Sequence, residues 1–193
     1  NRGWTLDTAK KLITVGRTFE SKNVLSSYGA LLDSLLIDRL ITRISRTLTA
    51  LIEPRKLFLD TFFESIAQVF KPDLMGIVIA DTYSPWAGFH VEGTMKKESI
   101  ANVIEKINKQ LDVPKELTLD VRGELDDKGK SLAELEILPV MGEKNGIAAL
   151  VFGSYQKKAF DTNAKAFMAQ LQVQMRPVTQ LLLAKQEIEV LHS

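Results

Sequence analysis

The densest group of aromatic and titratable side chains outside the predicted helices lies between residues 81 and 90. It contains Asp81, Tyr83, Trp86, Phe89 and His90. Aromatic rings there could stack on a planar ligand, while carboxylate and imidazole groups could supply polar contacts. These five residues are therefore the candidate ligand-binding residues of the chain.

A structural interpretation of the same group stands beside the ligand-binding one. Trp86 and Phe89 could simply fill the core, and His90 could be exposed or satisfied locally. For His90 we favour this interpretation, because one histidine with no cysteine and no second histidine nearby is a poor metal site. No metal ligand is therefore predicted.

A second group of charged residues follows between residues 120 and 128. It could be interpreted as an acid/base pair or a cation site, but the spacing of a calcium loop is missing and turn residues are usually solvated. We therefore predict a plain hairpin turn here. The group consists of Asp120, Arg122, Glu124, Asp126, Asp127 and Lys128.

The composition removes several classes of chemistry. With no cysteine in the chain, disulfides, thiolate metal sites, thiol nucleophiles and covalently attached bilins are excluded, and a cytoplasmic location is expected. The sequence also contains no G-x-S-x-G motif, phosphate loop or zinc motif. We therefore expect a non-catalytic protein, and the identity of any cofactor stays open.

The charge balance and the hydropathy pattern restrict the partners. The 25 Lys and Arg residues nearly cancel the 24 Asp and Glu residues, for a formal net charge of +1, so no nucleic-acid partner is predicted. The longest apolar stretches, such as residues 146–153, are far shorter than the roughly 18 residues of a spanning helix. No membrane segment is predicted in this chain, which we interpret as a piece of a longer protein.

Two segments carry apolar residues at the alternating spacings of three and four that are typical of a coiled-coil seam. We expect them to form signalling helices that hold a homodimer together. The N-terminal seam lies in a helical extension over residues 1–52, and the C-terminal seam lies in a helix over residues 176–193. The seam residues are Ile37, Ile41, Ile44, Leu48, Leu51, Leu181, Ala184, Ile188 and Leu191.

The elements between these segments predict a core domain over residues 53–175. A helix to about residue 70 precedes a short apolar strand over 74–80 and a second strand over 86–91. A helix over 96–111 comes next, then strands near 117–121, 132–141 and 147–154, and a helix that starts at Asp161 or Thr162. Pro177 should kink or break that last helix. The predicted fold is α+β, with an antiparallel sheet of five to six strands.

The end of this pattern resembles the GAF family. The resemblance rests on Leu138-Pro139-Val140, the turn at Asn145-Gly146, the strand over 147–154 and the helix opened by Phe160-Asp161. Upstream, residues 44–70 and the strand that ends at Asp81 are similar to the opening helix and first strand of the family. The resemblance covers about residues 45 to 190 and implies a GAF-like fold.

The resemblance implies a sensory or regulatory role. GAF domains sense small molecules, bind chromophores or serve as dimerising spacers, and their ligands lie between one sheet face and the loops near the candidate residues. The missing cysteines exclude bilin attachment and methionine sulfoxide reductase chemistry, and no clear cyclic-nucleotide signature is present.

Residues 187–193 resemble the helical linker that precedes a GGDEF diguanylate cyclase domain, and similar linkers feed histidine kinases. We therefore expect a ligand-binding sensor that signals through its helices to such an output domain. The alternatives are a ligand-free dimerisation spacer and, as the weakest, a stand-alone enzyme.

Overall fold

The computed structural model describes residues 35, 38–39, 54–113, 116–143 and 146–192. The chain divides into two compact units, residues 1–39 and residues 40–193. Of the first unit, only Leu35, Asp38 and Arg39 are described, and they are helical. The predicted N-terminal seam residues Ile37, Ile41, Ile44, Leu48 and Leu51 lie outside the described residues.

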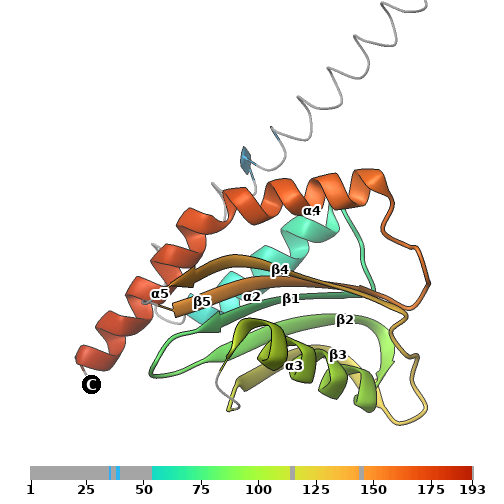
Figure 1. Cartoon of the computed structure of the whole chain (residues 1–193), viewed down its shortest axis with the longest axis horizontal. Coiled ribbons are helices and arrows are strands. Elements are labelled where there is room, and N and C mark those ends of the chain that lie inside the picture. The colour runs from blue at the N-terminus through green and yellow to red at the C-terminus, as the bar shows by residue number, and fades with distance from the viewer. Residues whose placement is uncertain (1–34, 36–37, 40–53, 114–115, 144–145, 193) are drawn as a thin grey trace, which may run out of the picture. The chain divides into compact units, whose positions relative to one another are not determined.

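The described part of the second unit is an α+β fold built on one five-stranded sheet (Figure 1). The elements run in the order α2 (Pro54–Ala67), β1 (Leu74–Ala80), β2 (Trp86–Lys96), α3 (Lys97–Leu111), β3 (Thr118–Asp126), β4 (Glu134–Glu143), β5 (Gly146–Ser154), α4 (Thr162–Gln174) and α5 (Arg176–Leu191). The strand order is β3-β2-β1-β5-β4. The predicted α+β class and the order of these helices and strands are confirmed, apart from shifts of a few residues at their ends.

The central strand β1 is buried along its whole length. Its odd-numbered residues, such as Ile77, contribute to a core shared with α2, α4 and α5, and its even-numbered residues, such as Val78, contribute to a core shared with α3. This alternation follows from the pleat of a strand, which points successive side chains to opposite faces. Helices therefore cover both faces of the sheet, as Figure 1 shows.

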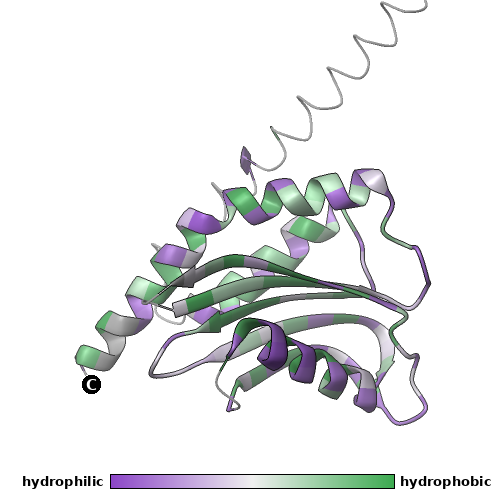
Figure 2. Ribbon diagram, in the orientation of Figure 1, coloured by the Kyte–Doolittle hydropathy of each residue, from purple (hydrophilic) through white to green (hydrophobic). Residues whose placement is uncertain are grey.

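Hydropathy follows the same layers. The strands are predominantly hydrophobic, whereas the visible side of α3 is predominantly hydrophilic (Figure 2). Ile100, Val103 and Ile107 form the buried side of α3. Their spacings of three and four place them on one stripe of the helix, which rests on the sheet.

The sheet is mixed, so the prediction of an antiparallel sheet is wrong for one strand pair. β1 pairs antiparallel with β2 and β5, and β4 pairs antiparallel with β5, but β2 and β3 are parallel. The reason is α3, which carries the chain back along the sheet so that β3 starts at the same end as β2.

The hairpin predicted at Asp126-Asp127-Lys128-Gly129 is also wrong, although a turn is present. Gly129 donates its amide to the carbonyl of Asp126 at 3.2 Å. The strands on either side of this turn do not pair, because β3 and β4 lie at opposite edges of the sheet. The turn therefore begins a crossing between the two edges.

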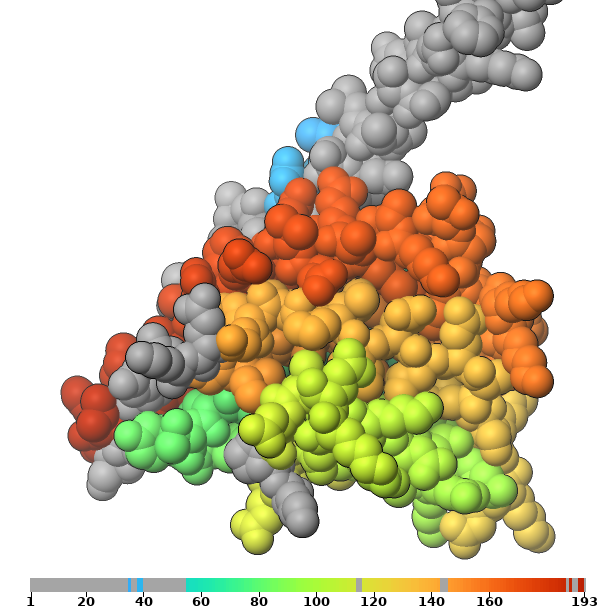
Figure 3. All heavy atoms as spheres, in the orientation of Figure 1, coloured from blue at the N-terminus to red at the C-terminus, as the bar shows by residue number. Residues whose placement is uncertain are grey.

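The final helical segment breaks at Met175, two residues before Pro177, as predicted. Asp161 caps α4 by accepting a hydrogen bond from the amide of Ala164 at 2.8 Å. On the face drawn in Figure 3, β4 lies between α3 and the two C-terminal helices. α4 therefore packs beside β4, whereas α5 contacts both β4 and the central strand β1.

Candidate functional site

The structure does not gather the five predicted ligand-binding residues around one cavity. Trp86 and Phe89 are both buried, but Trp86 belongs to the core under α2, α4 and α5, and Phe89 belongs to the core under α3. Residues three apart on a strand point to opposite faces. The two rings therefore lie on opposite sides of the sheet and cannot stack on the same ligand.

Trp86 contacts a cationic side chain of α2. The guanidinium carbon of Arg55, in the first turn of α2, lies 4.9 Å from the centroid of the Trp86 ring. A cation over an indole face is attracted by the ring quadrupole. This contact links the start of α2 to the start of β2.

His90 lies on the same side of the sheet as Trp86, against α2. Its ring centroid is 5.7 Å from that of Phe63, and its Nε2 is 3.6 Å from a carboxylate oxygen of Glu92. The imidazole side chain is about one-third exposed. His90 therefore contacts Phe63 and Glu92 and stays partly exposed.

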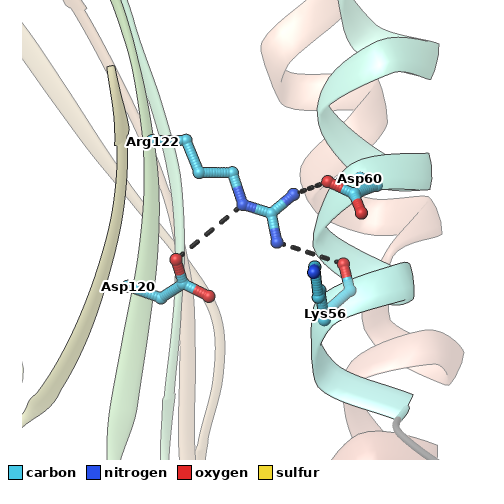
Figure 4. A network of polar contacts seen from close by, with 4 residues as sticks. All are labelled: Lys56, Asp60, Asp120 and Arg122. Atoms are coloured by element: carbon cyan, nitrogen blue, oxygen red, sulfur yellow. Dashed lines mark hydrogen bonds and ion pairs between the residues drawn. The ribbon is translucent and has the colours of Figure 1, made fainter. Parts of the chain in front are cut away.

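Beside His90, Arg122 of β3 forms the centre of a polar network (Figure 4). The sequence placed Arg122 and Asp120 in a charged turn and did not predict the position of Arg122 on a strand or its contact with α2. Its guanidinium donates hydrogen bonds to the Asp60 carboxylate and, at 3.1 Å, to the carbonyl of Lys56. Its Nε lies 3.8 Å from Asp120. Burial of the guanidinium lowers the pKa of Arg122.

This network fastens α2 to an edge strand. Asp60 and Lys56 lie one helical turn apart on α2, so both can meet the fork of one guanidinium. The carbon Cζ of Arg122 also lies 6.0 Å from the ring centroid of Phe63. The contacts of Arg122 therefore join the edge strand β3 to α2.

Asp81 and Tyr83 lie in the turn that joins β1 to β2. Asp81 Oδ1 accepts hydrogen bonds from the amides of Tyr83 at 3.1 Å and Ser84 at 2.6 Å. The other carboxylate oxygen, Oδ2, is buried and has no hydrogen-bond partner. Tyr83 is 62% exposed. An unpaired buried carboxylate oxygen is unfavourable and leaves an acceptor for a donor group, a water molecule or an ion.

Gln186 of α5 also reaches this turn. Its Nε2 donates to the carbonyl of Ser84 at 2.5 Å and lies 2.7 Å from the Ser84 hydroxyl. Gln186 was not among the residues predicted from the sequence, although its spacing carried a signal. It follows Val178 and Leu182 at intervals of four, which predicts a buried position on the same helix face.

Two surface hollows lie away from these residues. One, of about 110 Å³, lies between α3 and the start of β4 and is lined by Ser99 and Lys106 among others. The other, of about 370 Å³, lies beside the first turns of α5, against Pro139 and Arg176. None of the five predicted ligand-binding residues lines either hollow. In the part of the chain that the structure describes, no group of three or more His, Asp or Glu residues is placed to hold a metal ion.

The four predicted seam residues of the C-terminal helix lie on one exposed line of α5. Leu181, Ile188 and Leu191 are 42%, 57% and 73% exposed, and Ala184 is exposed too. The opposite side of the helix is buried against the sheet through Val178, Thr179, Leu182, Leu183 and Gln186. At about 100° per residue, the centres of these two lines face nearly opposite directions.

No protein-family model matches this chain, and no curated protein shows significant similarity to it. Among the described helices, none has the length and apolar character needed to cross a membrane.

Proposed function

We propose that this chain is a non-catalytic, GAF-like regulatory module that responds to a small ligand and transmits a conformational signal through α5. The receiving region is an output domain that follows the helix, with a diguanylate cyclase as first candidate and a histidine kinase as second. The proposal rests mainly on the two faces of α5.

α5 carries two apolar faces, and only one of them packs against the sheet. A helix that only covers a sheet needs one apolar stripe. The stripe of Val178 and Leu182 meets that need, since both residues are buried in the same core as Trp86. The second line, from Leu181 to Leu191, is exposed in the single chain.

The spacing of the exposed line favours a second copy of the same helix as its partner. Its members follow one another at intervals of three, four and three, which is the repeat that keeps a seam between two supercoiled helices. Because both copies would present the same line, a two-fold symmetric homodimer satisfies both at once. Either proposed output enzyme is suited to control by such a dimer.

The packing of α5 supplies a route for the signal. The same helix touches the sheet on one side and would touch its partner on the other. A shift of the sheet core under Val178 or Leu182 therefore changes the position of the seam relative to the second copy. The input is proposed at the β1–β2 turn, where Asp81 keeps an unpaired buried oxygen and Tyr83 is exposed.

A ligand-free dimerisation spacer is the second candidate function. It is favoured by the burial of Trp86 and Phe89, whose rings fill two separate cores. Native mass spectrometry of the purified chain, with a thermal-shift screen of metabolites, separates the two candidates. A bound small molecule or a stabilising compound supports the sensor, whereas no added mass and no stabilising compound support the spacer.

The seam is tested by charge substitution. In the double variant Leu181→Asp/Ile188→Asp, two carboxylates on each copy would have to be buried without partners, so the dimer should dissociate. We expect sedimentation velocity to show a dimer for the wild-type chain and a monomer for the variant, with the circular dichroism spectrum unchanged.

The matched control places the same charges on exposed apolar residues elsewhere. Leu119→Asp/Val69→Asp alters two residues that are 43% and 39% exposed and do not lie on α5. This control should remain a dimer. A seam variant that sediments like the wild-type dimer would overturn the proposed interface.

A further inference from the structure

Gln186 is a polar residue on the otherwise largely apolar buried face of α5. It is 8% exposed, and its amide nitrogen meets both the carbonyl and the hydroxyl oxygen of Ser84, at 2.5 and 2.7 Å. These two residues are 102 positions apart in sequence. The contact therefore joins the turn at the end of the central strand to the helix that carries the exposed seam.

Ser84 is held from two sides. Its own amide donates to Asp81 Oδ1 at 2.6 Å, while its carbonyl and hydroxyl oxygens meet the Gln186 amide. A displacement of Ser84 therefore disturbs both contacts. Asp81, Ser84 and Gln186 form one chain of hydrogen bonds from the β1–β2 turn to α5.

This chain is sensitive to small movements for two reasons. Gln186 is buried, and a buried amide that loses its partner is strongly disfavoured, so the helix has to move with the turn or find another partner. Gln186 also lies between Ala184 and Ile188, which belong to the exposed seam on the other side of the same helical turn. A shift of α5 that follows Ser84 therefore displaces the seam.

We infer that the β1–β2 turn controls α5 and that Gln186 is the positioning residue that couples the two. This inference rests on the proposed function, because it assigns the place where a signal enters the helix. Asp81 sets the conformation of the turn through Oδ1, and any group that approaches Oδ2 acts on the same side chain. The seam then responds through Gln186, with no contact between the input and the second copy.

Coupling of this kind is reciprocal, and that property gives the test. Hydrogen–deuterium exchange of the full chain, followed by peptide mass spectrometry, reports separately on residues 81–85 and residues 182–191. Gln186→Met removes the donor but keeps the side-chain length, and it should speed exchange in the turn. Ser84→Ala and Asp81→Ala alter only the turn, and they should speed exchange in α5.

We expect an increase of about fivefold in each remote segment, which corresponds to the loss of one hydrogen bond of ordinary net strength from a local opening equilibrium. Ser84→Ala keeps the backbone carbonyl and should give the smaller effect of the two turn variants. It also keeps the test valid if Asp81→Ala fails to fold.

Gln172→Met is the matched control. Gln172 of α4 donates to the carbonyl of Pro139 at 2.5 Å, so this variant removes a similar bond between a helix and the sheet at another place. It should leave exchange at residues 81–85 at the wild-type rate. Equal acceleration of the turn by both methionine variants would overturn the inference, since it would reflect general loosening.

The outcomes separate this inference from the proposed dimer. If turn variants leave residues 182–191 unchanged while the wild-type chain sediments as a dimer, the coupling is wrong and the seam stands. If the wild-type chain is a monomer but the turn variants speed exchange in α5, the coupling is supported and the dimer is wrong.

Discussion

Arg122 illustrates how one side chain can fix the position of a whole helix. Its guanidinium bonds to two groups of α2 and lies near Asp120 of its own strand. The geometry depends on the fork of the guanidinium, which donates in two directions at once. Arg122 therefore holds α2 against β3.

We predict that Arg122→Met lowers the free energy of unfolding by about 1 kcal/mol. Methionine keeps an unbranched stem against Phe63 but removes both hydrogen bonds, and the value is modest because the Asp60 carboxylate is partly in water. Urea denaturation measures the change. Lys109→Met, which breaks the exposed pair with Glu105 on α3, should leave the unfolding midpoint nearly unchanged. The same midpoint for both variants would contradict a special role for Arg122.

At the residue scale, the sequence indicated which single side chains fill the core. It did not indicate which residues make contact across long distances in the chain. The structural interpretation, in which Trp86 and Phe89 fill the core, is confirmed. Their separation by three positions on a strand already implied that they lie on opposite faces of the sheet. Arg122 and Gln186 were not predicted as contacts. Their partners lie 62 and 102 positions away, and no local spacing reports such a pairing.

At the scale of elements, the C-terminal end of α3 shows how the backbone conformation of one residue ends a helix. Asp112 follows its last residue with φ 52° and ψ 41°, in the left-handed region. This conformation ends the helix so that the chain can turn toward β3, and it is one that glycine adopts with the least strain.

We therefore predict that Asp112→Gly raises the free energy of unfolding by roughly 0.5 kcal/mol, because it relieves the backbone strain at the helix end. Chemical denaturation with a fluorescence readout is sufficient to detect the shift. The matched variant Ala101→Gly, at an exposed position inside α3, should instead lower stability by about 1 kcal/mol. A loss of stability in Asp112→Gly would show that the aspartate side chain matters more than its backbone conformation.

Elements whose identity depends on local pattern were predicted well. The apolar run of β1, the break near Pro177 and the hairpin between β4 and β5 all follow from nearby residues, and all are present. The direction of β3 was missed because it depends on which strand it joins. Alternating apolar residues identify a strand, but they do not say whether its neighbour is parallel.

At the scale of the whole molecule, α5 is part of the core and not a separate attachment. Val178, Leu182 and Leu183 belong to the same buried cluster as Phe58 of α2 and Ile77 of β1. The helix is therefore both a structural layer of the domain and the element that we propose to carry its signal. Such a dual role ties the stability of the module to its output.

A chain that ends at Met175 tests this integration. It loses three large buried side chains, each worth about 1.5–3 kcal/mol when removed from water, and it exposes the sheet beneath them. We expect it to unfold at a much lower temperature than the full chain or to lack a cooperative transition in calorimetry. A truncated chain with the melting temperature of the full chain would show that α5 is dispensable for folding.

The absence of cysteine allows the most direct test of the central claim, that α5 presents its exposed line to a second copy. Ile188→Cys introduces the only thiol of the chain, so any disulfide must join two copies. At a seam position the two sulfur atoms face each other across the symmetry axis. Mild oxidation of Ile188→Cys should therefore give a covalent dimer on a non-reducing gel. Lys109→Cys, on the exposed side of α3, should run as a monomer on the same gel. Cross-linking of Ile188→Cys that is no stronger than that of Lys109→Cys would contradict the proposed seam.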